Sequence, residues 1–140
     1  MTSTRSWLAV PVAAVLLAGC GLQSIPQAEN AVAAAWAETE NQYQRRADLV
    51  PNLVETVKAY AAHERETLEA VVAARAKATQ VTFTADQLNV ENLKKFEAAQ
   101  KELGSALGRL LAVSENYPQL KASENFRDLQ AQLEGTENRI

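Results

Sequence analysis

The sequence predicts an all-α protein, an elongated antiparallel bundle of three to four helices whose last helix is incomplete. Apolar residues recur every three, four and seven positions along most of the chain, the spacing that places them on one face of a helix. Aromatic residues make up only 6% of the 140 residues, while alanine is abundant, and this composition favours helix over sheet. Five Gly and four Pro are few for an all-β protein. We therefore expect one helical domain.

The charges separate a short N-terminal segment from an acidic body. All seventeen acidic residues follow Cys20, and Arg5 is the one basic residue that precedes it. The body thus carries thirteen of the fourteen basic side chains against seventeen acidic ones, a net charge of −4. A nucleic-acid partner would need a concentrated basic face, so we expect none. The single cysteine excludes an internal disulfide.

Residues 1–19 have the features of an export signal. Arg5 supplies a positive charge, and the apolar run 7–18 is shorter than the roughly 20 residues of a membrane-spanning helix. The run leads into Leu17-Ala18-Gly19-Cys20, which looks like the bacterial lipobox, a cleavage and lipidation signal. By that resemblance, Cys20 becomes the first residue and carries a diacylglyceryl group, with a further acyl chain on its amine. The alternative is a free Cys20 thiol at the end of an uncleaved signal anchor.

Both alternatives tether the protein to a membrane. Two or more acyl chains anchor a protein stably, whereas one chain binds only marginally. Residues 20–27 would then be the lipidated cysteine and a short flexible spacer, and residues 28–140 the helical domain. We expect the protein on the cell membrane or the outer membrane, with its body outside the cytoplasm.

The first apolar stripe begins near Glu29 and continues to Ala74. Its largest members are spaced by seven, and they are Trp36, Tyr43, Val50 and Val57. Pro51 removes a backbone donor inside the stripe, but the apolar phase continues across it, which predicts a kinked helix or two nearly collinear helices. An unbroken helix over 28–78 would be about 75 Å long at 1.5 Å per residue.

A second stripe follows the connection 79–84. Thr84 and Gln87 have the spacing of a capping box, which would start a long helix that Pro118 ends. Gly104 and Gly108 lie four apart on this helix, and charged neighbours argue against a bilayer, so we expect them to pack closely against a neighbouring helix. After a turn at 119–123, a third stripe runs to the last residue; its members are Phe126, Leu129, Leu133 and Ile140.

Catalytic motifs are missing from the sequence. His63 and Glu64 begin a zinc-protease motif, but Thr67 stands where the second histidine is required. Tyr60 stands where a di-iron Glu-x-x-His would need glutamate. No serine lies in a Gly-x-Ser-x-Gly elbow, and Gly104 and Gly108 are not followed by the Lys-Ser or Lys-Thr of a phosphate loop. We expect no enzyme, no metal and no cofactor.

Polar side chains gather around Pro51. They are Asn41, Gln44, Arg45, Arg46, Asp48 and Asn52. One interpretation is structural: four of these side chains satisfy the backbone groups that the proline frees and pair with carboxylates of the next helix, and they are Arg45, Arg46, Asp48 and Asn52. The other interpretation is a recognition surface for an anion or a peptide.

The stretch 41–64 closely resembles the signature of the LemA family. Further similarities follow, in Ala73-Ala74-Arg75-Ala76, Ser114-Glu115-Asn116-Tyr117-Pro118, Leu120-Lys121-Ala122, Asn125-Phe126 and 133–140. The resemblance implies an antiparallel helical bundle held on a membrane, without an established catalytic activity. LemA-like proteins usually begin with an uncleaved membrane helix and continue beyond the Glu-Asn-Arg-Ile segment. The lipobox is therefore a departure from the family, and the chain resembles a truncated member.

Two functions fit these features. The first is a non-catalytic, membrane-tethered bundle that acts as a scaffold or binding module for other proteins of the bacterial cell envelope. The alternative is a sensory bundle that binds a small ligand or peptide at the polar residues 41–52. An enzyme is the least favoured reading, because the sequence supplies helix-packing residues without a catalytic constellation.

Overall fold

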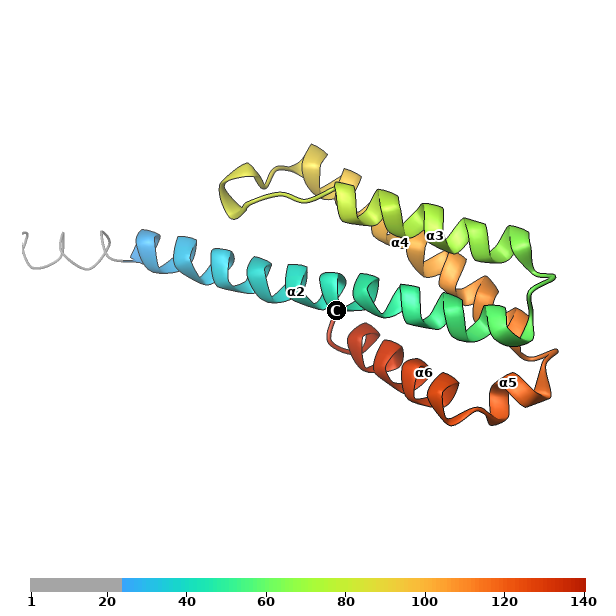
Figure 1. Ribbon diagram of the computed structural model, residues 1–140. Coiled ribbons are helices and arrows are strands. Elements are labelled where there is room, and N and C mark those ends of the chain that lie inside the picture. The colour runs from blue at the N-terminus through green and yellow to red at the C-terminus, as the bar shows by residue number, and fades with distance from the viewer. Residues whose placement is uncertain (1–23) are drawn as a thin grey trace, which may run out of the picture. The chain divides into compact units, whose positions relative to one another are not determined.

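The computed structural model describes residues 24–140, which form five α-helices and one short 3-10 helix, without a strand in this range (Figure 1). The elements are α2 (Ser24–Tyr60), α3 (Arg65–Gln80), η1 (Ala85–Gln87), α4 (Val90–Ser114), α5 (Pro118–Ala122) and α6 (Glu124–Glu137). The all-α prediction is confirmed. The chain divides into two compact units at the boundary between Ala37 and Glu38, and the second unit contains the core.

Helix α2 continues through Pro51, and the chain reverses later, at residues 61–64. The expectation of an apolar helix running on to residue 78 is therefore wrong. The turn is closed by a 3.0 Å bond from the Glu64 amide to the Ala61 carbonyl. Ala61 is fully buried, as is Val71 on the returning helix α3. Both helices face the same core, so the apolar residues keep the same spacing across the turn. The spacing alone therefore does not indicate that the chain reverses at residues 61–64.

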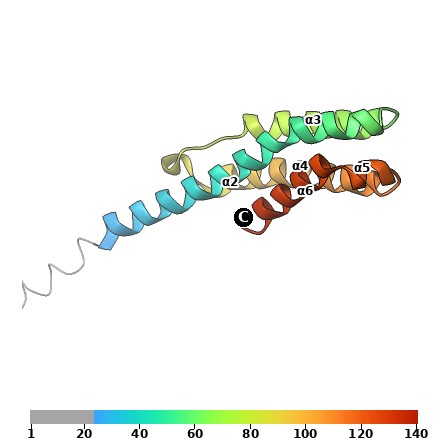
Figure 2. The same cartoon turned by 60° about the horizontal axis from the view of Figure 1, so that its bottom comes forward.

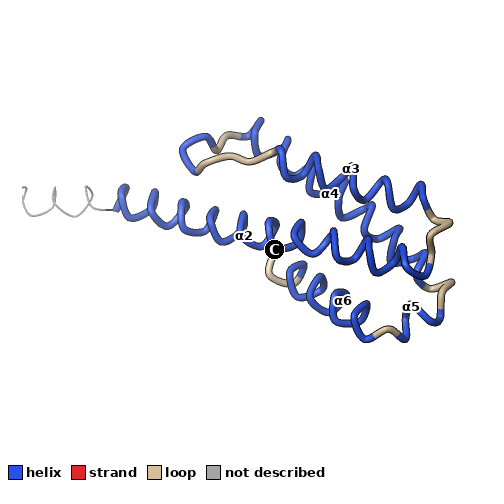
Figure 3. The backbone as a smooth tube through the Cα atoms, viewed as in Figure 1, coloured by secondary structure: helices blue, strands red, loops and turns tan. Residues whose placement is uncertain are grey.

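Other boundaries also differ from the expected ones. Helix α2 begins at Ser24, so residues 24–27, which were expected in the flexible spacer, are helical. Thr84 precedes the 3-10 helix η1, where its amide donates to Gln87 Oε1 at 3.2 Å. Helix α4 starts later, because Asn89 caps it by accepting the Asn92 amide at 2.8 Å. Figure 3 shows the tan connection that contains η1.

Pro118 begins the short helix α5, although residues 119–123 were expected to form a turn. Proline is well placed at the first position of a helix, because its missing N–H has no helical partner there. Ser123 then caps α6 by accepting the Phe126 amide at 3.4 Å. In both Figure 1 and Figure 2, α3 lies along α4, and α5 leads into α6.

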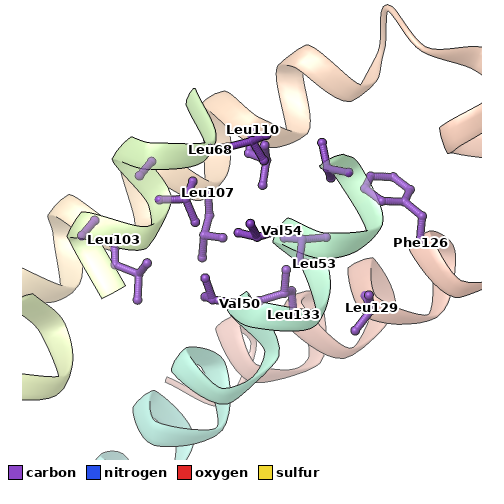
Figure 4. Packing of buried hydrophobic residues seen from close by; sticks show 14 of the residues in the cluster. Val50, Leu53, Val54, Leu68, Leu103, Leu107, Leu110, Phe126, Leu129 and Leu133 are labelled. Carbon is purple, nitrogen blue, oxygen red and sulfur yellow. The ribbon is translucent and has the colours of Figure 1, made fainter. Parts of the chain in front are cut away.

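One hydrophobic cluster joins the helices of residues 38–140. Figure 4 shows Val50, Leu53 and Val54 of α2 lying among leucines of α4 and α6. The largest fully buried side chains are Phe126, Leu53, Leu103, Leu110, Leu120, Val50, Val57 and Val71. Each such side chain contributes about 1.5–3 kcal/mol by leaving water. This packing fixes the surfaces on which the polar residues lie.

Candidate functional site

Arg46 is the polar residue that connects three helices. Its side chain is only 4% exposed, and its Nη1 pairs with Glu137 Oε1 on α6, whose side chain is 53% exposed. Its Nη2 donates to the carbonyl oxygen and to Oε1 of Gln100 on α4, at 2.8 and 3.0 Å. A buried guanidinium needs such acceptors, because burying a charge without them is costly. Arg46 therefore holds α2, α4 and α6 together.

Tyr43 lies one helical turn before Arg46 and extends this polar centre. The guanidinium carbon of Arg46 is 5.2 Å from the ring centroid, and the ring meets Phe96 edge-on with centroids 5.0 Å apart. Burial raises the pKa of Tyr43, an effect that Arg46 opposes and that Glu137 and Glu97 reinforce. The phenol is consequently neutral at physiological pH.

The other polar residues of 41–52 do not converge on a shared point. Asn41, Arg45, Asp48 and Asn52 are exposed, and so is Gln44, whose amide donates to Asp48 at 2.8 Å. Of the six predicted residues Arg46 alone is buried, and the sequence reasoning missed Gln42, which is also buried and whose Nε2 donates to Glu38 Oε1 at 2.9 Å.

Pro51 frees the carbonyl of Ala47, four residues earlier, because proline has no N–H to donate. Arg75 Nε of α3 donates to that carbonyl at 2.8 Å. The structural interpretation of 41–52 therefore holds only in part. Arg46 pairs with a carboxylate, although on α6, and an arginine of α3, outside this stretch, satisfies the freed carbonyl. A bond from α3 is possible because the reversal at 61–64 brings α3 back along α2.

A groove of about 860 Å³ lies beside Arg46, between α4 and α6. Its lining residues are Tyr43, Arg46, Glu97, Gln100, Lys101, Gly104, Ser105, Leu107, Gly108, Leu111, Leu133, Glu134, Glu137, Asn138 and Ile140. We call this the α4–α6 groove. Its walls combine leucines, of which Leu107 and Leu133 are buried, with charged side chains of both α4 and α6.

Gly104 and Gly108 open this groove. A Cβ at Gly108 would meet nothing within 4 Å, and one at Gly104 would meet only Arg46 Nη1 at 3.8 Å. The expected close packing of the two glycines against a neighbouring helix is therefore wrong for residues 24–140. The sequence reasoning did not assign Glu134 and Glu137, the acidic wall of the groove, to a site, although both lie in the segment 133–140 that resembles the LemA family.

Metal-ligating clusters and membrane-spanning helices are both absent from residues 24–140. Residues 24–140 contain no group of three His, Cys, Asp or Glu side chains that could hold a metal ion. In the same range, no helix combines the length and the apolar character required to cross a bilayer. Cys20 and the proposed signal 1–19 lie outside the described residues.

Comparison with known proteins identifies the family. No curated protein matches the chain. The family model described as "LemA family" matches residues 35–140, which includes the complete core and both walls of the α4–α6 groove. This family is not known as an enzyme family. Because the match covers most of its length, the chain belongs to the LemA family.

Proposed function

We propose that this protein is a non-catalytic binding module or scaffold of the bacterial cell envelope, tethered to a membrane by lipid on Cys20. The observation that carries the proposal is the α4–α6 groove. Arg46 lines this groove and binds Gln100 of α4, and Gly104 and Gly108 leave space beside α4. The fold supports a rigid surface on helices, and rigid helices position a binding surface more accurately than loops do.

The chemistry of the groove favours an amphipathic helix as the partner. Leu111, which is partly buried, and Ile140, which is 42% exposed, supply the apolar contact above the buried Leu107 and Leu133. Arg46 and Glu137 neutralise one another, so the unpaired charges of the lining are mainly acidic, with Glu97 and Glu134 outnumbering Lys101. A partner helix with an apolar face and basic residues at its edges would complement both properties.

The two open glycines also suit a helical partner. Small residues allow the backbones of two helices to approach closely, and Gly104 and Gly108 lie four apart on one face of α4. A bulkier residue at Gly108 would project into the space that the partner occupies.

A matched pair of variants tests this binding surface. Gly108→Leu fills the α4–α6 groove, while Gly135→Leu adds the same side chain to α6 at another open position, outside the groove. Affinity capture from solubilised envelope membranes should recover a partner with wild type and Gly135→Leu, and lose it with Gly108→Leu. Equal recovery by all three proteins would refute the groove as the binding surface.

The lipid anchor is tested separately by the intact mass of the membrane-extracted protein. We expect a mass that corresponds to a chain beginning at Cys20 with attached acyl chains. An unmodified chain that retains residues 1–19 would exclude the lipoprotein part of the proposal, without affecting the groove.

The alternative function, a sensor for small anions or peptides, has one observation in its favour. Arg45 and Arg139 line a hollow of about 150 Å³ on the α2 and α6 surface, and neither forms an ion pair within residues 24–140. Gly135 lines the same hollow. Gly135→Leu would therefore abolish binding under this alternative, the reverse of the result expected for the α4–α6 groove.

A further inference from the structure

The hollow between α2 and α6 carries two arginines that have no partner within residues 24–140. Its volume is about 150 Å³, and its lining residues are Gln42, Arg45, Gln132, Gly135, Thr136 and Arg139. Arg45 and Arg139 are exposed, and neither side chain forms an ion pair or a hydrogen bond in this part of the chain. We call this the α2–α6 hollow.

The packing of α6 against α2 brings these two arginines together. Arg46 pairs with Glu137, and Asn125 Nδ2 donates to Thr56 Oγ1 at 3.0 Å, so the two helices run antiparallel (Figure 1). The two arginines of the hollow lie one and two residues from the members of that ion pair. They are therefore close to the same level, one on each wall of the hollow.

Gln42 supplies an acceptor that the bundle leaves unused. The residue is 6% exposed, and its Nε2 donates to Glu38 Oε1 at 2.9 Å. Its Oε1 is buried and accepts no hydrogen bond from any group of residues 24–140. A buried acceptor without a donor is unfavourable, so a ligand that brings a donor gains from pairing with it. The rim side chains Arg45, Gln132 and Arg139 are exposed, and they can turn to admit a donor to this oxygen.

We infer that the α2–α6 hollow binds the C-terminal residue of a peptide. The two arginines pair with the terminal carboxylate, whose geometry guanidinium groups match. The amide N–H of the same residue donates to Gln42 Oε1. The hollow is smaller than the roughly 300–1,000 Å³ of sites for drug-sized ligands, so it holds about one residue and the rest of the peptide lies outside.

Other small anions fit the hollow less well. Acetate pairs with the arginines but has no N–H for Gln42 Oε1. Inorganic phosphate carries more than one negative charge near pH 7, and the carboxylate of Glu38, bonded to the same glutamine, disfavours that extra charge. This inference deepens the alternative function, the binding of a small ligand or peptide, and rests on it. It is independent of the α4–α6 groove.

Titration of the full chain in detergent with acetylated triglycine tests the inference, followed by the NMR signals of the arginine side chains. The peptide with a free carboxylate should shift the signals of Arg45 and Arg139 saturably, with a dissociation constant of roughly 1 mM. Acetate should bind about fivefold more weakly, because it loses one hydrogen bond. The same peptide with an amidated C-terminus should not bind, because it has no charge to pair with the arginines.

Matched variants separate binding at the hollow from general charge effects. Arg45→Gln and Arg139→Gln should each weaken binding of the peptide about tenfold or more, whereas Arg127→Gln, the same change at an exposed arginine of α6 outside the hollow, should not. Gln42→Leu should remove the advantage of the peptide over acetate. Gly135→Leu should abolish binding because it fills the hollow, and it leaves the α4–α6 groove open.

Three results would overturn the inference. They are the absence of a saturable shift in the wild type, equal binding of the amidated peptide, and equal weakening by Arg127→Gln and Arg45→Gln. Saturable binding of inorganic phosphate without binding of the peptide would also overturn it, while leaving the hollow as an anion sensor. Loss of the partner of the α4–α6 groove would not affect these titrations, so the two failures are distinguishable.

Discussion

Replacing Arg46 with methionine should destabilise the fold by about 2–3 kcal/mol. Methionine keeps most of the side-chain volume but removes every donor, so Oε1 of Gln100 loses its partner, while the Gln100 carbonyl loses a second donor and keeps its bond within helix α4. Gln100 is buried, and an unsatisfied buried acceptor costs about 1–3 kcal/mol. Loss of the ion pair with Glu137 adds little to the free-energy cost, because the Glu137 side chain is 53% exposed and water can replace the guanidinium there. Methionine also avoids the cost of burying a charged guanidinium, so the destabilisation is smaller than the sum of the lost interactions.

Urea unfolding followed by circular dichroism measures this difference in the free energy of unfolding. Arg45→Met is the matched control, since Arg45 is exposed, and it should stay within about 0.5 kcal/mol of wild type. Glu137→Gln should cost less than about 1 kcal/mol, because that position is half exposed. If Arg46→Met were as stable as Arg45→Met, the guanidinium would not hold the three helices together, and a role in ligand binding alone would fit better.

Two further predictions concern the bonds on either side of the α2–α3 turn. Arg75→Met should lower the free energy of unfolding by about 1–2 kcal/mol in the wild-type background, because it leaves the Ala47 carbonyl unpaired. The cost should be clearly smaller in the Pro51→Ala background, where residue 51 regains an N–H for that carbonyl. Equal costs in the two backgrounds of this double-mutant cycle would contradict this role for Arg75. The Tyr117 hydroxyl donates to Glu64 Oε1 at 2.9 Å, and this bond raises the pKa of Tyr117 in the folded protein. Its stabilisation is therefore complete below the unfolded pKa, near 10, and is lost as the pH rises through the higher folded value. Urea midpoints from pH 8 to 11 should fall less for Tyr117→Phe than for wild type, and parallel curves would argue against the bond.

The helix faces were predictable from the sequence, but the direction of the chain was not. Val50, Val57, Leu68 and Val71 were correctly placed on one apolar stripe, and all four are buried. Periodicity reports which side of a helix is buried, and two antiparallel helices around one core show the same phase. The turn at 61–64 contains neither Gly nor Pro, so no breaker residue revealed it.

The polar residues show a similar division. A cluster around Pro51 could be recognised, but the partners of Arg46 and of the Ala47 carbonyl lie 28 to 91 residues away in the sequence. Such pairings depend on which helices become neighbours, and local sequence carries no information about that. Gly104 and Gly108 were read as a packing surface, and only the position of α6 shows that the space beside them is open.

The central claim is that the α4–α6 groove holds a partner of the envelope. A photo-crosslinking residue at Ser105, which is exposed and lines the groove, tests this in intact cells, with Gln132 of the α2–α6 hollow as the control position. We predict one crosslinked partner from Ser105, absent from Gln132, and lost when Gly108→Leu is added while the urea midpoint stays at or above the wild-type value. A crosslink that persists with Gly108→Leu, or that forms only from Gln132, would contradict the claim.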